Sequence, residues 1–519
     1  MHNKSFDALS EKDFDALLQN NMPELLPEDI VENVTPWRRA INRVLIGMVL
    51  QVITLNFLWL DYILPAIGLT LMILGFRALQ RENVWFRIAW IASLVRAVYF
   101  FPLLILNATI FQGSAYVTPP LLAAFVLNFA IVFLLFFCLR RSFMAVQKKA
   151  GLSLHVDSAT ALVIWYALVC LLALLNYQGI IIGLMIIVAY IFIIKNLFKL
   201  SEELEEAGYA ICASPVRLPD KAVGRAIFAF LVFGITCGYL FGGSYPMQWA
   251  VPSHEETAQI SEIKAHLIGL GFPAAILDDL TKEDILACEG ALQVVVDVEE
   301  YPINKGREVH NVNSSGERYT YWHTTTVYDV KELRITGIAV ELPSPTEQWK
   351  IFHHFLWSVN PGFRGTEAIQ LWPAYRNFDN GAWGALGEVT GQVLYDLKGQ
   401  TYCAPYYSLE SETYTAYDFF GGEQITTDQF AAFSMPNRGQ AHRGYISYAV
   451  EELKDGYILD SWINYVHQRS RFQYPVLTAK DHQLIGSWLG NGNGPFIVIQ
   501  DALQFFSLDE GVDLINMTN

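Results

Sequence analysis

Seven apolar stretches lie between residues 42 and 242, and the lysines and arginines between them occur on alternate connections only. An apolar stretch of about 20 residues is long enough to cross a bilayer as a helix, and shorter ones can span with little tilt. The predicted spans are Val44–Trp59, Tyr62–Phe76, Ile88–Ala108, Thr118–Leu139, Ser158–Asn176, Gly179–Ile194 and Ala226–Phe241. We therefore expect an α-helical polytopic domain embedded in a lipid bilayer.

The distribution of basic residues predicts how these spans are oriented. Counted from Arg38, fifteen lysines and arginines precede the first span or follow the second, fourth and sixth, whereas the other three connections carry none. Positively charged connections stay in the cytoplasm, which predicts a cytoplasmic N-terminus and an extracytoplasmic C-terminal part, most simply in the plasma membrane. The first 40 residues are polar and acidic, so we expect the first span itself to act as the insertion signal.

Composition divides the chain into four parts. They are an acidic cytoplasmic tail at 1–41, a seven-helix membrane domain at 42–244, a helical lead at 245–290 and a β-rich extracytoplasmic domain at 291–519. From residue 245 onward there are 17 basic and 35 acidic groups. A body of that charge repels nucleic acid and anionic lipid head groups, so we expect no nucleic-acid partner and ligands that are cationic or neutral.

The N-terminal tail holds two short amphipathic patterns, and Pro27 followed by Glu28 and Asp29 is typical of a helix start. Residues 1–36 could bind a cytoplasmic protein by laying an apolar helix face in a groove. The alternative is a helix that lies on the inner face of the membrane domain. The sequence leaves both open.

The C-terminal domain changes from helical to strand periodicity. Helices are expected at 256–270 and after Thr281, where Asp284 three residues later fits a capping pattern. From Leu292 to Val298 apolar and polar residues alternate, and the ranges 334–342 and 349–357 also favour strands. Helices confined to the start and many strands after them predict a β-sandwich or jelly-roll-like fold.

Two turns are predicted to connect hairpins in this domain. Lys454-Asp455-Gly456 separates strand patterns at 445–452 and 457–468, and Lys398-Gly399 separates those at 393–397 and 401–407. Such compositions suit tight turns with positive φ.

Aromatic residues give the first candidate binding site. Rings stack on the C–H faces of sugars while nearby polar groups bind hydroxyls, so we consider a ligand site formed by Trp357, Trp372, Asp379, Trp383 and Trp462. The alternative for each tryptophan is burial in the core of a large β domain, which is the commoner fate of strand aromatics.

Arg96 is the one charged residue at the centre of a predicted span. A charge there costs at least about 2.5 to 3.5 kcal/mol, so it should face a polar partner or a wet cavity. Asn56, Tyr99 and Asn107 are its candidate polar neighbours, and the group could bind an anion or a lipid phosphate. The alternative is that residues from Gln80 to Arg96 lie along the membrane interface and the span begins later.

Catalytic signals are weak. His353 and His354 are adjacent on a predicted strand and so point to opposite faces, which prevents both from binding one metal. Glu341, Glu367, Asp379 and Glu388 are the carboxylates available for glycoside hydrolysis, but their spacing cannot be read from sequence. No hydrolase, nucleotide-binding or zinc motif occurs, so we expect no metal or cofactor.

Two cysteines, Cys288 and Cys403, fall in the predicted extracytoplasmic domain. In an oxidising compartment they could form a disulfide, and the alternative is a pair of buried free thiols in a domain large enough to build its own core.

Three functions fit this organisation. The first is a signalling receptor or regulator whose extracytoplasmic domain binds an envelope glycan, peptide or other ligand and acts on a cytoplasmic tail. The second is a transporter or export-complex subunit, which the lack of intramembrane carboxylates weakens. The third is a membrane-tethered envelope enzyme, for which no nucleophile or metal set is evident. The first uses every part of the chain, and we expect the protein not to be an enzyme.

The orientation can be tested with a reporter enzyme that folds only outside the cytoplasm. Fused after Asn519, the reporter should be active, whereas fusion within the basic connection at 140–149 should leave it inactive, because that segment is predicted to stay inside. Whole-cell reporter activity is the measurement. Activity from the second fusion alone would reverse the orientation.

Overall fold

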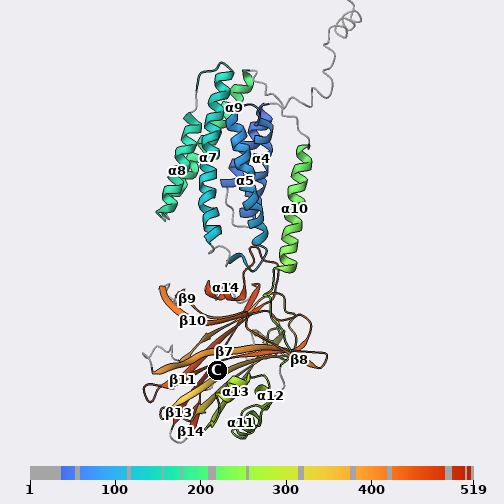
Figure 1. The fold of residues 1–519 in the computed structure, drawn as a ribbon, viewed down its shortest axis with the longest axis vertical. Coiled ribbons are helices and arrows are strands. Elements are labelled where there is room, and N and C mark those ends of the chain that lie inside the picture. Colours follow the sequence, from blue (N-terminus) through green and yellow to red (C-terminus); the bar gives the residue numbers. More distant parts are fainter. Residues whose placement is uncertain are drawn as a thin grey trace, which may run out of the picture. The chain divides into compact units, whose positions relative to one another are not determined.

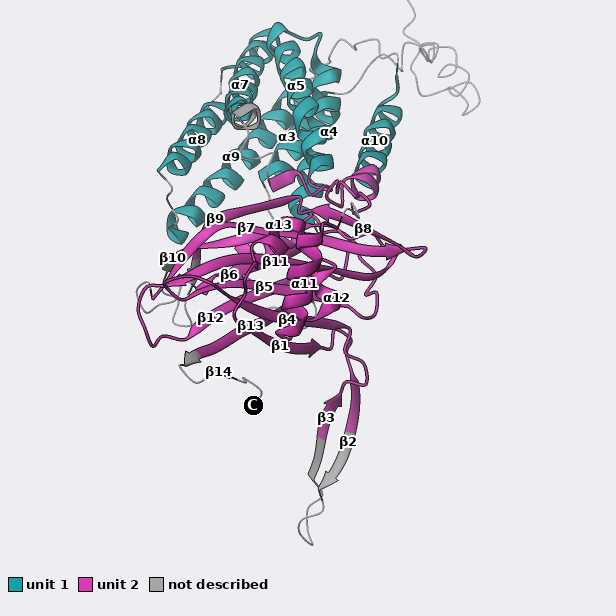
Figure 2. Cartoon of the chain, turned by 60° about the horizontal axis from the view of Figure 1, so that its bottom comes forward, with its two compact units in different colours: residues 1–106, 114–236 teal, residues 107–113, 237–519 magenta. Residues whose placement is uncertain are grey.

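A computed structural model describes most of the chain (Figure 1). The described residues are 37–52, 59–113, 119–154, 157–175, 177, 179–207, 218–252, 256–313, 321–374, 382–417, 423–485, 494–508 and 511–515. The chain forms two compact units, which Figure 2 colours separately. Residues 1–106 and 114–236 form the helical unit, and residues 107–113 and 237–519 form the sandwich unit. The predicted tail helices within 1–36 lie outside the described residues.

The helical unit contains the predicted spans as helices. They are α3 (Trp37–Val52), α4 (Leu60–Leu79), α5 (Val84–Leu106), α7 (Pro119–Lys149), α8 (Asp157–Leu174), α9 (Ile180–Glu206) and α10 (Asp220–Phe241). Six of the described helices, α4 to α10, are long and apolar enough to cross a membrane, which makes this an integral membrane protein. Helix α3 is the described part of the first predicted span, whose following residues 53–58 lie outside the description.

Close packing of α3 on α4 depends on two glycines. A Cβ atom placed on Gly47 would lie 2.5 Å from the carbonyl oxygen of Gly68, and one on Gly68 would lie 2.5 Å from that of Gly47. Because any side chain here would collide with backbone, only glycine allows the two helices to approach this closely. Small residues serve the same purpose in many membrane helix pairs.

The sandwich unit consists mainly of two six-stranded antiparallel sheets. Sheet one has the order β1 (Val294–Tyr301), β4 (Leu333–Leu342), β5 (Gln348–Trp357), β11 (Gln440–Glu452), β7 (Trp383–Leu397) and β8 (Gln400–Pro405). Sheet two has the order β14 (Gly511–Leu514), β13 (Phe496–Leu508), β12 (Leu459–Gln468), β6 (Glu367–Trp372), β10 (Glu423–Phe433) and β9 (Ser408–Tyr417). Strands β2 (Arg307–Asn313) and β3 (Tyr321–Val327) form a separate hairpin. This architecture agrees with the predicted β-sandwich.

Alternation along the strands places apolar side chains between the two sheets. Ile335 of β4 and Phe355 of β5 belong to the same core cluster as Leu371 of β6 and Tyr465 of β12. All four are at most 1% exposed. Burial of large apolar side chains at this interface is the main force that holds the sheets together.

The opposite face of sheet one is also buried, because the helical lead covers it. The lead contains α11 (Ala258–Gly269), α12 (Ala274–Leu277) and α13 (Lys282–Leu286). Ile263 and Leu267 of α11 join Ile338 and Phe352 of sheet one in a second apolar cluster. On sheet two the short helix α14 (Ala479–Leu484) packs on Ala368 through Ala479.

One predicted hairpin is confirmed and the other is wrong. Strands β7 and β8 pair through Leu397 and Gln400, and the intervening Lys398 and Gly399 have φ values of 54° and 78°. The turn at Lys454-Asp455-Gly456 instead connects strands of different sheets, because β11 pairs with β5 and β7 on its two edges. A central strand has no free edge for the next strand, so the chain crosses to sheet two.

Two carboxylates of the helical lead bind cations on the outer face of sheet one. Asp284 lies 3.0 Å from the Nζ atom of Lys350, and both side chains are almost fully buried. Asp284 also accepts hydrogen bonds from Tyr445 and Thr390, at 2.6 and 2.7 Å. Burial acts to raise the pKa of the Asp284 carboxyl, but Lys350 and these hydrogen bonds outweigh it and lower that pKa.

The second carboxylate, Asp279, accepts a hydrogen bond from the Nε atom of Arg443 at 2.7 Å and lies 3.0 Å from the Nε2 atom of His354. Arg443 in turn binds Asp396 at 3.0 Å. Because opposite charges meet on both sides, the network neutralises itself and fixes the lead on the sheet.

Replacing Lys350 with methionine should destabilise the sandwich unit by about 3 kcal/mol, because it leaves Asp284 buried without its cation. Arg334→Met is the control, since its pair with Glu300 is exposed and worth only about 0 to 1 kcal/mol. Chemical denaturation followed by tryptophan fluorescence measures both. Equal effects of the two variants would show that the buried pair contributes no more than a surface pair.

Candidate functional site

A bulge in β7 opens a cleft in the sandwich unit. Ser447 of β11 pairs with Thr390 of β7, but Ala449 pairs with Leu386, so residues 387–389 stand opposite Tyr448 alone. Gly387 supplies the positive φ of 71° within this bulge. The cleft has a volume of about 390 Å³ and is lined by Ala385, Leu386, Gly387, Glu388 and Val389 of β7, Leu409, Glu410 and Ser411 of β9, Gln429 of β10, and Tyr448 and Ala449 of β11.

The cleft combines acidic and apolar groups. Glu388 and Glu410 are exposed at its surface, whereas Tyr448 is buried beneath them. Gln429 donates a hydrogen bond to the Oγ atom of Ser411 at 2.6 Å. Glu410 is paired with Lys480 of α14 at 2.6 Å, while among the described residues Glu388 forms no ion pair. The cleft can therefore hold a small molecule that carries a cationic or hydrogen-bonding group.

Four tryptophans of the predicted ligand site separate into two pairs. Trp372 of β6 and Trp462 of β12 are direct neighbours in register on the outer face of sheet two, and both are partly exposed. Trp357 and Trp383 are 1% and 2% exposed and belong to the core. The structure thus brings one pair together at a surface and buries the other. Asp379 lies outside the described residues.

A polar network lies on the same face of sheet two as the exposed pair. Gln370 donates to the Oδ2 atom of Asp428 at 2.6 Å, and Tyr414 donates to the same atom at 2.5 Å. Asn464 and Gln483 donate to the Oε1 atom of Gln370, at 2.8 and 2.6 Å. These groups satisfy one another and hold α14, which carries Gln483, on the sheet.

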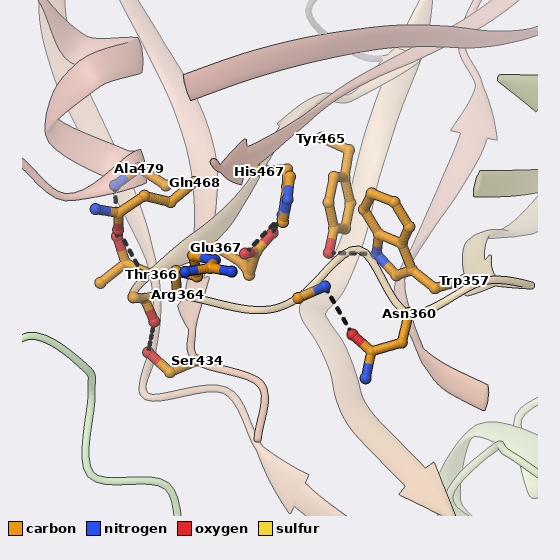
Figure 3. A network of polar contacts seen from close by, with 12 residues as sticks. Trp357, Asn360, Arg364, Thr366, Glu367, Ser434, Tyr465, His467, Gln468 and Ala479 are labelled. Atoms are coloured by element: carbon orange, nitrogen blue, oxygen red, sulfur yellow. Dashed lines mark hydrogen bonds and ion pairs between the residues drawn. The ribbon is translucent and has the colours of Figure 1, made fainter. Parts of the chain in front are cut away.

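Glu367 and His467 form a pair inside the sandwich (Figure 3). The Nδ1 atom of His467 lies 2.9 Å from the Oε1 atom of Glu367, and both side chains are at most 2% exposed. Burial raises the pKa of the Glu367 carboxyl, while hydrogen bonds from His467 and Tyr465 oppose that rise. Trp357 donates to the hydroxyl of Tyr465 at 3.0 Å. The pair is sealed from solvent, so we interpret it as a structural link.

The remaining candidates for metal or acid–base chemistry do not converge. His353 faces the core, where its Nε2 atom lies 2.7 Å from the Oγ atom of Ser461, and His354 faces the helical lead. The predicted opposite orientation is therefore present. Within the described ranges, no group of three metal-binding side chains gathers in one place. Of the candidate carboxylates, Glu388 lines the cleft, Glu367 is sealed and Glu341 is the next-to-last residue of β4.

Arg96 lies inside a continuous helix, α5, which begins at Val84. The interfacial alternative began the span after Arg96, and the helix is continuous through that position. Its Nε atom donates to the Oδ1 atom of Asn128 at 3.1 Å, and its Nη1 atom donates to Gln51 of α3. Tyr99 donates to the same oxygen of Asn128. Neutral amides thus solvate the guanidinium at the centre of the helical unit.

The other predicted neighbours of Arg96 lie elsewhere. Asn56 is outside the described residues, and Asn107 belongs to the sandwich unit, where its carbonyl accepts a hydrogen bond from the backbone N–H of Val476 at 2.8 Å. Gln51 and Asn128, the actual partners, were not predicted. Polar residues inside apolar stretches were the signal that could have identified them.

Cys288 and Cys403 are free thiols in the structure. Cys288 is buried beneath the helical lead, where its Sγ atom lies 3.4 Å from the carbonyl oxygen of Asp284. Cys403 is in β8, and its backbone pairs with Ala250. Burial raises the pKa of both thiols, that of Cys288 to about 12. Cys288 is thus a buried free thiol, whereas Cys403 is free and partly exposed.

Asp501 is a further acidic group that the sequence did not single out. It is 6% exposed and accepts a hydrogen bond from the hydroxyl of Tyr301 at 2.6 Å, which links β13 of sheet two to β1 of sheet one. Burial raises the pKa of the Asp501 carboxyl to about 7, and the nearby Asp297 and Glu299 add to the effect.

Comparison with known protein families finds no match, and comparison with curated proteins finds none either. The functional argument therefore depends on the geometry of the chain itself.

The elevated pKa of Asp501 predicts a dependence of stability on pH. Between about pH 4 and pH 7 the folded chain retains a proton that the unfolded chain releases, so stability falls as the pH rises through this range. Asp501→Asn should remove that loss. At pH 8 we expect the variant to have a higher melting temperature than wild type, with a free energy of unfolding about 2 to 4 kcal/mol larger. At pH 4.5 we expect little difference between the two.

Thermal unfolding of the full chain at both pH values is the measurement, with the exposed Asp455→Asn as the control. A gain of the same size at both pH values would contradict the assignment, because it would reflect packing rather than protonation.

Proposed function

We propose that the protein is a membrane-anchored ligand-binding protein, receptor-like or regulatory, whose sandwich unit binds a small cationic or neutral envelope ligand in the cleft at the β7 bulge. The bulge carries the proposal. A regular strand would leave Gly387, Glu388 and Val389 in the ladder, whereas the bulge turns them toward Glu410 and leaves a cleft of about 390 Å³. Bulges often occur where a strand forms a binding site.

Binding is better supported than catalysis. The polar residues that line the cleft are two glutamates, a serine, a glutamine and a tyrosine, and among the described residues no histidine, lysine or cysteine lines it to activate a nucleophile. The His467–Glu367 pair, which has acid–base groups, is sealed in the core. The negative charge of the cleft agrees with the acidic composition of the C-terminal part.

A second candidate is glycan binding on the outer face of sheet two. The adjacent Trp372 and Trp462 are partly exposed, and Asn464 and Gln370 lie on the same face. Stacking rings beside amides are suited to sugars. The amides are already bonded to each other and to Gln483, however, so we favour the cleft.

The connection between α5 and α7 is the proposed route from ligand to membrane. Residues 107–113 belong to the sandwich unit: the Nε2 atom of Gln112 donates to the carbonyl of Val476 at 2.9 Å, and the backbone N–H of Ile110 donates to the carbonyl of Gly242 at 2.8 Å. A ligand that shifts these contacts would act directly on the end of α5, the helix that carries Arg96. We propose that the output reaches a cytoplasmic partner through residues 1–36.

The cleft can be tested on the full chain in lipid nanodiscs by calorimetry with spermidine and with a chitin tetramer as probes. Spermidine should bind, and Glu388→Gln and Glu410→Gln should each weaken it about tenfold by removing a carboxylate. Ala449→Trp should abolish binding by filling the cleft. Glu300→Gln is the matched control, because Glu300 is an exposed carboxylate on β1 that is paired with Arg334 of β4. This variant should bind spermidine as tightly as wild type.

If the chitin tetramer binds to wild type and to Ala449→Trp but not to Trp462→Ala, the binding site is the outer face of sheet two and the proposal of the cleft is wrong. Breakdown of either probe on incubation would show an enzyme. If neither probe binds, the proposed cation site in the cleft is wrong.

A further inference from the structure

An apolar groove runs between α3 and α9 in the helical unit. It has a volume of about 590 Å³ and is lined by Val49 and Val52 of α3 and by Ile187, Tyr190, Ile191, Ile194, Lys195 and Phe198 of α9. Both helices belong to the same compact unit. The sequence analysis assigned it no role, and it is separate from the cleft of the sandwich unit.

The length of the groove corresponds to one leaflet of a bilayer. From Ile187 to Phe198 an α-helix rises about 17 Å, and half of a typical hydrocarbon core is about 15 Å. The side chains along this length are apolar except for Tyr190 and Lys195. The groove can therefore accommodate an extended acyl chain over the whole depth of a leaflet.

Lys195 gives the groove a charged end. Its side chain is exposed, and among the described residues it forms no ion pair. The next lysine on the helix, Lys199, is 4.0 Å from Glu203. A flexible lysine at the end of an apolar groove can extend to the membrane surface and bind a phosphate there.

Tyr190 forms part of the wall of the groove. The side chain is 5% exposed, and its ring packs against Trp165 of α8 with centroids 4.6 Å apart, which fixes its position. Its hydroxyl is buried, so a molecule in the groove meets the ring and not the oxygen. The wall between Ile187 and Ile194 is therefore apolar toward a bound acyl chain.

We propose that this groove is a specific binding site for an anionic glycerophospholipid, with the head-group phosphate at Lys195 and an acyl chain that runs from there along Ile194, Ile191 and Ile187. The charge of Lys195 selects an anionic head group over a zwitterionic one. The site is independent of the proposed cleft, since no residue is shared.

Native mass spectrometry of the full chain in mild detergent tests this site, with palmitoyl-oleoyl phosphatidylglycerol and the corresponding phosphatidylcholine as probes. The wild type should bind one phosphatidylglycerol about tenfold more tightly than phosphatidylcholine. Lys195→Gln should remove that preference, whereas Lys199→Gln, one turn further along, should keep it.

Ile191→Trp provides a second measurement that does not depend on charge. The side chain is 59% exposed, so the substitution should fold, and its bulk should fill the groove and prevent retention of either lipid. Equal affinity for the two lipids in wild type, or an equal loss of preference in Lys195→Gln and Lys199→Gln, would overturn the proposal. Retention of lipid by Ile191→Trp at wild-type affinity would do the same.

Discussion

The two-sided burial of sheet one is the constraint on which the sandwich unit depends. Strands β4, β5 and β11 send alternate side chains to the core between the sheets and to the helical lead, and both faces exclude water. The face toward the lead nevertheless carries Lys350 and Arg443. Their presence is explained by Asp279 and Asp284, because a cation there is tolerated only when a carboxylate meets it.

The contacts of Asp279 and Asp284 also determine which part of β7 is held in place. The lead, sheet one and β7 are connected through Asp284, Thr390 and Asp279, so the edge of β7 near Thr390 is held firmly. A few residues earlier the ladder opens into the bulge. A strand that is paired on both sides of a bulge is a suitable frame for a small cleft, because the ladder fixes residues 383–386 and 390–394 while residues 387–389 line the opening.

Periodicity predicted most of the helices and strands, and the failures have physical reasons. The apolar helices, the helix cap at Thr281 and the turn at Lys398-Gly399 could be predicted because each depends on residues that are close in sequence. The connection at Lys454-Asp455-Gly456 was misread because turn composition does not say which strands pair. The cleft was missed because four strands line it, although the glycines at 384, 387 and 391 within one strand pattern were a signal of irregularity. For Trp372 and Trp462 the sequence left open whether the side chains lie at the surface or in the core. Only the pairing register of β6 and β12 places both on the outer face of sheet two.

The crossing of the chain from β11 to β12 has a consequence for biosynthesis. Strand β6 lies between β12 and β10, and β12 needs β13, so sheet two gains its central strands only when nearly the whole polypeptide has been made. Until then β6 and its apolar side chains have no permanent neighbour on one edge. Such long-range pairing is slow and leaves aggregation-prone edges exposed. The nascent chain is thus expected to need a holding chaperone until its last strands emerge, and truncations near the C-terminus should affect yield more than those at the β2–β3 hairpin.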